Sequence, residues 1–226
     1  MSLPVLIIGK SGSGKTYSLK NFSPEEVGII SVEKGRLPFK SNLKVIKIPK
    51  FENSEDIKTS AQLSTARYSY IEQVIKKAKC KAIVIDDSQY LLADEFFDRA
   101  KETGYQKFTD IALNFRNLIH HINDLEDDEK IIYFLHHSEC GDDGREKVKT
   151  VGKMLDDKLT VEGCFDVVLY CKDMKFYTQG DGISTAKSPE GMFDSIELPN
   201  DLKAVDQTIR AYYEIGKEET DGYKAH

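Results

Sequence analysis

Short apolar runs alternate along this chain with longer stretches in which apolar residues recur every three or four positions. The short runs are bounded by polar residues and are typical of strands that are buried on both faces of a sheet. The longer stretches are typical of helices that pack one face against a core. The alternation predicts an α/β fold, with a mostly parallel sheet and flanking helices. The expected strands cover residues 4–8, 27–32, 43–48, 82–87 and 130–135, and the expected helices cover 16–22, 65–79, 88–101 and 108–122.

The pattern changes in the C-terminal third of the chain. Two strand-like runs, at 165–171 and 175–179, are separated by three polar or flexible residues. This spacing predicts a C-terminal β-hairpin with a tight turn at 172–174. A short amphipathic helix follows, for which Asn200 or Asp201 is the expected N-cap.

Three polar segments show neither the periodicity of a helix nor the apolar run of a strand. Residues 51–64 are expected to form a loop, and the tail at 216–226 is expected to fray. Residues 139–163 are rich in glycine, lysine and aspartate, and a long segment of this kind is expected to be a mobile, functional loop. No linker divides the chain, so a single domain over residues 1–226 is expected.

A glycine-rich motif stands between the first strand and the first helix. Residues 9–16 match the phosphate-binding P-loop pattern G-x-x-x-x-G-K-[ST], and the order of strand, loop and helix is the required one. Gly12 and Gly14 are expected to adopt positive φ angles, which lets backbone N–H groups face a polyphosphate. Lys15 is expected to reach the β- and γ-phosphates, and the Thr16 hydroxyl to ligate Mg²⁺. The predicted contacts with ATP are Gly9, Lys10, Ser11, Gly12, Ser13, Gly14, Lys15, Thr16 and Tyr17.

Two carboxylates end the strand predicted at 82–87. This placement is typical of a Walker B strand, so we expect Asp86 to lie beside the P-loop and hold the hydration shell of Mg²⁺. The alternative is that both aspartates cap the helix that follows at Ser88, and Asp87 is the better candidate for that cap.

Histidines end the strand predicted at 130–135, and a basic segment follows them. Ligands of open α/β sheets bind at this edge, so His137 could sense the γ-phosphate, although a histidine without ligand contact is equally consistent. The basic segment could hold a nucleic-acid backbone. Acidic residues interrupt it and dilute its charge. The candidate DNA contacts are Arg145, Lys147, Lys149, Lys153 and Lys158.

Composition narrows the setting. The chain has 226 residues, is 40% hydrophobic and 31% charged, and carries a net charge of −6, which argues against broad binding of polyanions. It has no apolar run of membrane-spanning length and no secretory leader pattern, so a cytoplasmic location is expected. The four cysteines form no CxxC pair and are expected to be reduced thiols.

The order of these features resembles the RecA-like recombinase core. It is closer still to the phage-encoded P-loop single-strand annealing proteins, and the resemblance covers roughly residues 3 to 215. It implies that Glu33 orients the attacking water and that Asp86 is the Walker B aspartate. It also implies that His137 takes the place of the γ-phosphate sensor and that Lys187 reaches a neighbouring subunit's ATP. The segments at 93–107 and 138–160 would be the two DNA-binding loops.

The resemblance implies an ATPase that binds single-stranded DNA and promotes annealing or recombination. It would use ATP and Mg²⁺, assemble as a ring or filament with ATP between subunits, and could work with a single-strand DNA-binding protein. Three other classes are alternatives, two enzymatic and one non-catalytic. A nucleotide-kinase-like phosphotransferase is disfavoured because the arginines are scattered, and a GTPase lacks its N-K-x-D signature. A non-catalytic nucleotide-binding protein is the third alternative.

Overall fold

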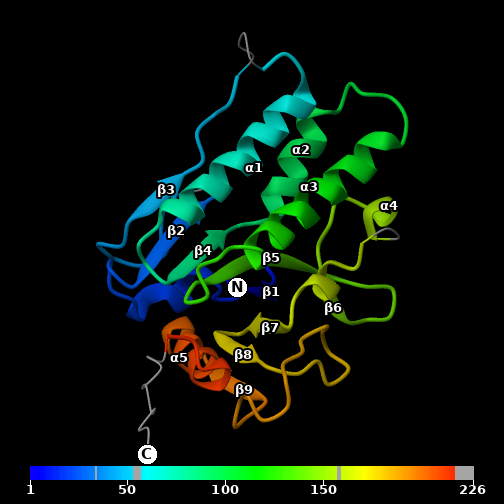
Figure 1. The fold of residues 1–226 in the computed structure, drawn as a ribbon. Helices are drawn as coiled ribbons and strands as arrows, with labels where there is room; N and C mark the ends of the chain where they lie inside the picture. Colours follow the sequence, from blue (N-terminus) through cyan, green and yellow to red (C-terminus); the bar gives the residue numbers. More distant parts are fainter. Residues whose placement is uncertain (34, 53–56, 157–158, 217–226) are drawn as a thin grey trace, which may run out of the picture.

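A single twisted sheet runs through the molecule, with helices on both of its faces (Figure 1). The computed structural model describes residues 1–33, 35–52, 57–156 and 159–216. The predicted α/β class with a mostly parallel sheet and flanking helices is confirmed. Residue 158 and the tail from 217 lie outside the described residues.

The strand order is β3-β2-β4-β5-β1-β7-β8-β9, with β6 paired to β5. The strands from β3 to β7 run parallel to one another, whereas β8 and β9 are antiparallel, as is β6 against β5. The predicted C-terminal hairpin is therefore confirmed as β7–β8. The bounds are β1 Leu3–Gly9, β2 Val27–Ser31, β3 Val45–Lys47, β4 Ala82–Asp86, β5 Ile131–Cys140, β6 Glu146–Val148, β7 Val167–Lys172, β8 Lys175–Tyr177 and β9 Glu197–Pro199.

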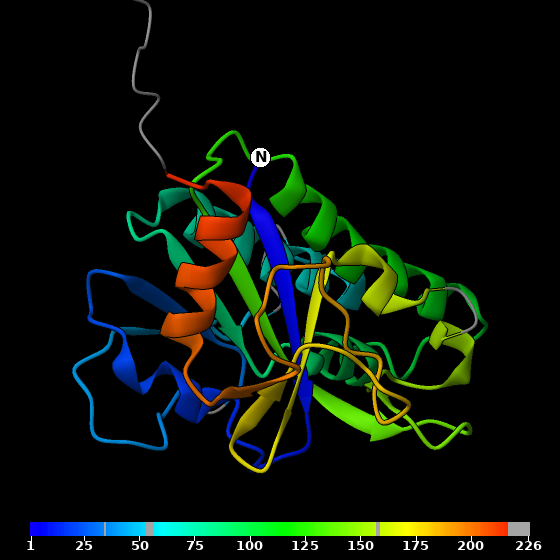
Figure 2. The ribbon, with the colours of Figure 1, turned by 90° about the horizontal axis from the view of Figure 1, so that it is seen from below.

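The helices form two layers around the sheet (Figures 1 and 2). Three long helices cover one face, and a 3-10 helix, η1, lies with α5 on the other face. Within the described ranges, no helix is both long enough and apolar enough to cross a bilayer. The bounds are η1 Thr16–Asn21, α1 Ser60–Lys77, α2 Gln89–Asp98, α3 Gln106–Asn123, α4 Lys153–Asp156, η2 Val161–Cys164 and α5 Leu202–Tyr213.

The central position of β1 in the sheet explains why its sequence is a continuous apolar run. Leu6 and Ile8 pack in the cluster beneath α1–α3, while Val5 and Ile7 pack in the cluster beneath η1 and α5. All four side chains are fully buried. Burying each contributes about 1.5–3 kcal/mol. Two helical layers therefore fix β1 in the middle of the core.

The parallel strands deliver their carboxyl ends to one edge of the sheet. β1 lies between β5 and β7, and the register pairs Gly9 with His137. β4 lies on the other side of β5, and its last residue is Asp86. The glycine-rich loop and the residues that end β4 and β5 are thereby brought together, at the place where open α/β sheets bind ligands.

Several element boundaries differ from the sequence-based expectations. Helix α1 begins at Ser60, so part of the loop predicted at 51–64 is helical. A capping box between Thr59 and Gln62 starts this helix. The helix predicted after the P-loop is a short 3-10 helix, and β9 was not predicted. Asp201 is confirmed as the N-cap of α5, since its carboxylate accepts from two backbone N–H groups.

The mobile loop predicted at 139–163 is wrong for the residues that the structure describes. β5 continues as far as Cys140, and β6 folds back on it in register. The two short helices α4 and η2 follow. The expectation failed because a three-residue strand is too short to show a period of two. We call the segment that spans β6 and the end of β5, residues 138–148, the β5–β6 hairpin.

Candidate nucleotide-binding site

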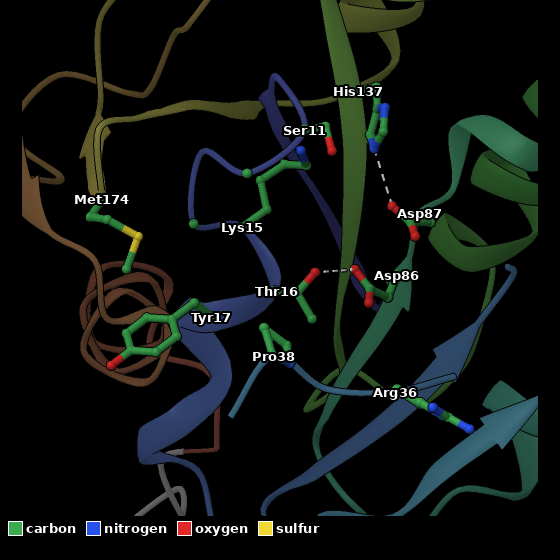
Figure 3. A pocket seen from close by; sticks show the side chains of 12 residues that line it. Ser11, Lys15, Thr16, Tyr17, Arg36, Pro38, Asp86, Asp87, His137 and Met174 are labelled. Carbon is green, nitrogen blue, oxygen red and sulfur yellow. Dashed lines mark hydrogen bonds and ion pairs between the residues drawn. The ribbon is translucent and has the colours of Figure 1, made fainter. Parts of the chain in front are cut away.

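The P-loop leaves β1 and wraps around the amino end of η1. Gly12 and Gly14 have φ angles of 79° and 110°, which confirms the predicted left-handed turns. The Lys15 ammonium group folds back and donates to the carbonyl oxygens of Gly9 (2.7 Å) and Lys10 (3.0 Å). Its side chain is buried in the loop, as Figure 3 shows. The ammonium group thus lies within the loop, where it can exchange these carbonyl oxygens for those of a polyphosphate bound by the loop N–H groups.

Glycine at position 14 is required by its neighbours as well as by its φ angle. A Cβ atom there would lie 2.7 Å from the Met174 sulfur and 3.0 Å from the Asn200 amide nitrogen. A Cβ at Gly12 would meet open space, so only its φ of 79° favours glycine. The loop therefore faces open space at Gly12 and packs closely against Met174 and Asn200 at Gly14.

Asp86 and Thr16 meet beneath the loop, as the sequence predicted for a P-loop and a Walker B strand. The Thr16 hydroxyl donates to Asp86 Oδ1 at 2.9 Å (Figure 3). Burial of the Asp86 carboxyl group, followed by repulsion from Asp87, raises its pKa to about 6. A buried carboxylate beside a hydroxyl is an oxygen donor set suited to Mg²⁺, so the residues fit the ion that the motif implies.

Asp87 turns toward the same opening instead of capping α2. Its φ of 61° is left-handed, and its carboxylate lies 3.2 Å from His137 Nε2 (Figure 3). The α2 N-cap is Ser88, which makes no side-chain capping bond. The N-cap position of α2 thus belongs to Ser88, whereas Asp87 contacts His137. Asp87 and His137 form a polar pair at the mouth of the site.

His136 points to the opposite side of β5 and is fully buried. Its Nδ1 lies 2.9 Å from the Ser88 hydroxyl, and its Nε2 lies 2.9 Å from the Lys149 carbonyl oxygen. The carbonyl can only accept, so Nε2 carries the proton and Nδ1 accepts from Ser88. Burial lowers the pKa of His136 to about 4. The neutral His136 side chain therefore links Ser88, which follows β4, to Lys149, which follows β6.

Lys10 ties the P-loop to the β5–β6 hairpin. Its ammonium group lies 2.7 Å from Glu146 Oε1, and the other oxygen of Glu146 accepts from the Ser138 hydroxyl at 2.7 Å. Both residues of the Ser138–Glu146 pair are buried, whereas the Lys10 side chain is 65% exposed. The Glu146 pKa is lowered by the Lys10 and Ser138 hydrogen bonds, which outweigh its burial. Lys10 thus has a partner outside the phosphate-binding loop.

The other two predicted catalytic residues lie away from this opening. Glu33 is exposed and does not line the cavity. Its charge acts on Asp94 of α2, whose pKa is raised by burial first and by Glu33 in addition. Lys187 pairs through its backbone with Val168, near the start of β7, and lines a separate cavity together with Glu162. The structure of one chain brings neither residue to Lys15.

The predicted DNA contacts are engaged largely with acidic neighbours. Arg145 pairs with Asp143 (2.7 Å) and Lys147 with Asp156 (2.6 Å). Lys153 lies 3.2 Å from Asp142, and the Lys149 side chain is exposed. Lys158 lies outside the described residues. The acids that interrupt this sequence segment therefore also neutralise much of its charge in space.

Several residues of the cavity were not singled out in the sequence. Arg36 and Pro38 follow β2 and approach from the side opposite Met174, which belongs to the β7–β8 turn (Figure 3). An arginine shortly after a strand only weakly indicates a binding site in the sequence. A methionine in a turn gives no such indication. The cavity is lined by Ser11, Gly12, Gly14, Lys15, Thr16, Tyr17, Arg36, Pro38, Asp86, Asp87, His137 and Met174.

The fold and the site together define a nucleotide-binding P-loop domain of the ATPase type. A protein family described as AAA domain matches residues 1–193 of the chain, and the chain belongs to this family.

Among curated proteins no match was found. One solved structure that the chain resembles is described as a prototypical ATPase from the type III secretion system of pathogenic bacteria. The identity is 14% and the TM-score 0.44, over 74% of this chain and 50% of that one. The chain therefore spans about half the length of that protein.

Proposed function

We propose that this protein binds Mg-ATP in the P-loop cavity and hydrolyses it. The observation that carries the proposal is the contact between Thr16 and Asp86 directly beneath a glycine loop that encloses Lys15. A buried carboxylate held against the hydroxyl that follows a P-loop lysine has little structural benefit, because burial disfavours its charged form. Its position is explained by a cation that it helps to hold.

The residues of the cavity would have separate roles in binding and hydrolysing ATP. Lys15 would exchange its two carbonyl partners for the β- and γ-phosphates, and the backbone N–H groups of the loop would bind the same oxygens. Thr16 and Asp86 would hold Mg²⁺, which neutralises charge on the phosphates when it is bound. Both effects stabilise the charge that develops during in-line attack on the γ-phosphate.

Two carboxylates compete for the role of orienting the attacking water. Glu33 occupies the position of the water-orienting glutamate in the RecA-like proteins that the sequence resembles. Asp87 lines the cavity beside His137. We favour Asp87, because a general base must come within hydrogen-bonding reach of the water. The single hydrogen of His137 Nε2 would then either orient Asp87 or be donated to the γ-phosphate, as a sensor would donate it.

The first experiment compares Lys15→Ala with Lys76→Ala, an exposed lysine near the end of α1. Calorimetric titration with Mg-ATP and the rate of phosphate release are measured for both. We expect Lys15→Ala to lose at least about 100-fold in affinity or turnover, since a charge-assisted phosphate contact is removed, and Lys76→Ala to match the wild type. Equal activity of Lys15→Ala and the wild type would overturn the proposed function.

A second experiment separates the two carboxylates. Asp87→Asn is expected to lower turnover at least about 100-fold while ATP binding changes little, since only the water is affected. Glu33→Gln is the matched variant and is expected to retain most of the turnover of a single chain. The opposite ranking would restore the role that the sequence suggested for Glu33.

We further propose that ATP turnover is coupled to single-stranded DNA, as the resemblance to annealing proteins implies. The supporting feature is the connection between α2 and α3, where Phe97 and Tyr105 are 70% and 75% exposed. Lys101 lies between them in the sequence, and the Lys107 ammonium group lies over two other rings of this corner, those of Phe96 and Phe108. Exposed aromatic rings interleaved with lysines are suited to stacking with unpaired bases.

Fluorescence anisotropy of labelled single-stranded DNA, with and without Mg-ATP and at two salt concentrations, tests this coupling. A Phe97→Ala/Tyr105→Ala double variant is expected to bind at least about tenfold more weakly than the wild type. Tyr213→Ala removes an exposed ring elsewhere and serves as the control. Absence of DNA binding by the wild type in every condition would remove this part of the proposal and leave the ATPase standing.

Assembly with ATP between subunits is also part of the proposal, with Lys187 acting on a neighbour's nucleotide. A mixture of Lys15→Ala and Lys187→Ala proteins tests it, since each supplies what the other lacks. Partial recovery of turnover in the mixture is expected if Lys187 acts in trans. A fully active Lys187→Ala protein would contradict this role.

A further inference from the structure

A second groove adjoins the phosphate cavity at the residue that follows the P-loop. Tyr17 and Met174 line both spaces, so they stand at the boundary between them. In Figure 3 the Met174 side chain points toward the ring of Tyr17. Beyond this boundary the groove runs between η1, the start of β8 and the corner between β9 and α5. Its remaining lining residues are Lys20, Asn21, Lys175, Glu197, Leu198, Pro199, Asn200 and Asp201.

We propose that this groove binds the nucleobase, that the base is adenine, and that Asn200 selects it. The inference deepens the proposed function and rests on it, because the triphosphate must lie in the P-loop. Tyr17 offers an aromatic ring for stacking once the Lys20 ammonium group, which lies over it at 4.6 Å, moves aside. Met174 offers a soft apolar surface on the other side. The two spaces join at these residues, so one nucleotide can place its phosphates in the first and its base in the second.

The walls of the groove are fixed relative to the P-loop by direct contacts. The Met174 backbone N–H donates to the Ser13 carbonyl oxygen at 3.1 Å, and the Cys171 thiol approaches the same oxygen at 3.4 Å. On the far side Asn21 donates to the Asp201 carboxylate at 2.7 Å, which ties η1 to the start of α5. The base site and the phosphate site therefore keep a constant separation, as recognition of one molecule requires.

Asn200 is an unusual lining residue because half of its amide group is unused. The side chain is 91% buried, and its nitrogen contacts the Cys171 sulfur at 3.5 Å. Its carbonyl oxygen is itself completely covered in this structure and has no hydrogen-bond partner among the described residues. Buried acceptors are normally paired, so an unpaired one beside a ligand groove indicates a donor that arrives with the ligand.

The unpaired acceptor favours adenine over guanine. Adenine presents the N6 amino group, a donor, where guanine presents the O6 acceptor. An amide oxygen facing O6 would leave both groups unpaired, which discriminates strongly against guanine. Met174 covers this part of the loop, since a Cβ on Gly14 would contact both its sulfur and the Asn200 amide. Met174 is unbranched and 43% exposed, so it can swing aside to admit the base.

Calorimetric titrations with ATP, GTP and inorganic tripolyphosphate test the inference on the full chain in the presence of Mg²⁺. The wild type is expected to bind ATP at least about tenfold more tightly than either GTP or tripolyphosphate. Asn200→Ala is expected to bring the ATP to GTP ratio close to one without changing tripolyphosphate affinity. Tyr17→Ala is expected to weaken ATP and GTP alike, because stacking does not distinguish the purines.

Asn123→Ala, at the end of α3, is the matched asparagine control and is expected to keep the wild-type preference. Circular dichroism melting identifies any variant that fails to fold, and Tyr17→Phe, which keeps the ring, is expected to bind like the wild type. Tripolyphosphate binding without any preference for ATP would overturn the base site alone. Failure of the wild type to bind tripolyphosphate or any nucleotide would instead overturn the proposed function.

Discussion

At the scale of single residues, Gly14 lies where two distant parts of the chain meet the P-loop. Its φ of 110° belongs to the motif, but the contacts that leave no room for a side chain come from positions 174 and 200. The sequence predicted the first property because a phosphate-binding turn requires it. The second follows from the sheet order, which no local pattern encodes. The same limit explains why Asp86 was predicted and Arg36 was not.

Gly14→Ala is therefore expected to cost more than backbone strain alone. Left-handed backbone costs alanine about 1–2 kcal/mol, and crowding in a packed site adds about 1–3 kcal/mol. Gly144 is the control, because its φ is 80° and a Cβ there meets nothing within 4 Å. Urea unfolding should show the larger loss for Gly14→Ala. Equal losses for the two variants would mean that Met174 and Asn200 yield freely.

His136 makes a second residue-scale prediction, on the dependence of stability on pH. Its pKa is about 4 when folded, against 6.5 ordinarily, so protons bind more readily to the unfolded chain. The contribution of the neutral His136 to the free energy of unfolding is fully present above about pH 6.5. It is lost as the pH falls toward 4, by about 3 kcal/mol in total. We expect His136→Gln to lack this loss.

The measurement is urea unfolding of both proteins from pH 7.5 down to pH 4. Asp86 titrates in the opposite sense, since its raised pKa of about 6 makes stability rise as the pH falls through that range. The difference between the two proteins isolates the histidine. A difference that stays constant with pH would show that His136 does not resist protonation in the folded state.

At the scale of elements, the β5–β6 hairpin shows what sequence patterns miss. The long strands and helices were predicted because their periods extend over enough residues to be recognised. β6 and β9 have three residues each. β6 is stabilised by pairing with the ten-residue β5, and β9 by pairing with β8, which is as short as β9 itself. The glycines and mixed charges at 139–163 suggested a mobile loop. In the structure those charges pair across the hairpin and the short helix α4.

The hairpin depends more on Glu146 than on the lysine that pairs with it. Glu146→Ala leaves the buried Ser138 hydroxyl without its acceptor and is expected to cost about 1–3 kcal/mol. Lys10→Ala removes only the solvent-exposed end of the ion pair and is expected to cost less stability than Glu146→Ala. Thermal unfolding of both variants tests this ranking. A larger loss for Lys10→Ala would show that the ion pair itself holds the hairpin.

At the scale of the whole molecule, the match to the AAA domain family ends at residue 193, before the structure does. α5 buries Leu202, Val205 and Ile209 against the sheet, and Asp206 accepts from the buried Tyr133 hydroxyl at 2.7 Å. Arg210 donates to the carbonyl oxygens of Glu129 and Lys81. The sequence predicted this helix from its period and its cap, and the contacts show that it closes the second face of the core.

Removal of residues 194–226 is therefore expected to abolish cooperative folding. Exposing three core side chains and the surface that they cover costs about 5–8 kcal/mol, which is comparable to the whole stability of a domain. A chain that ends after residue 216 is the control and should melt like the full chain. Cooperative melting of the 1–193 fragment at the full-length temperature would contradict the role given to α5.

The position of β1 has a consequence for amide hydrogen exchange. The strand is bonded on both edges, to β5 and β7, and both of its faces lie in the core. Its amide hydrogens can therefore meet water only when the whole domain opens. A ligand held by the loop at its end slows that opening by its full binding free energy, about 2.7 kcal/mol at 100 times its Kd. The protons of Ile7 and Ile8 should thus record nucleotide affinity without any label on the nucleotide.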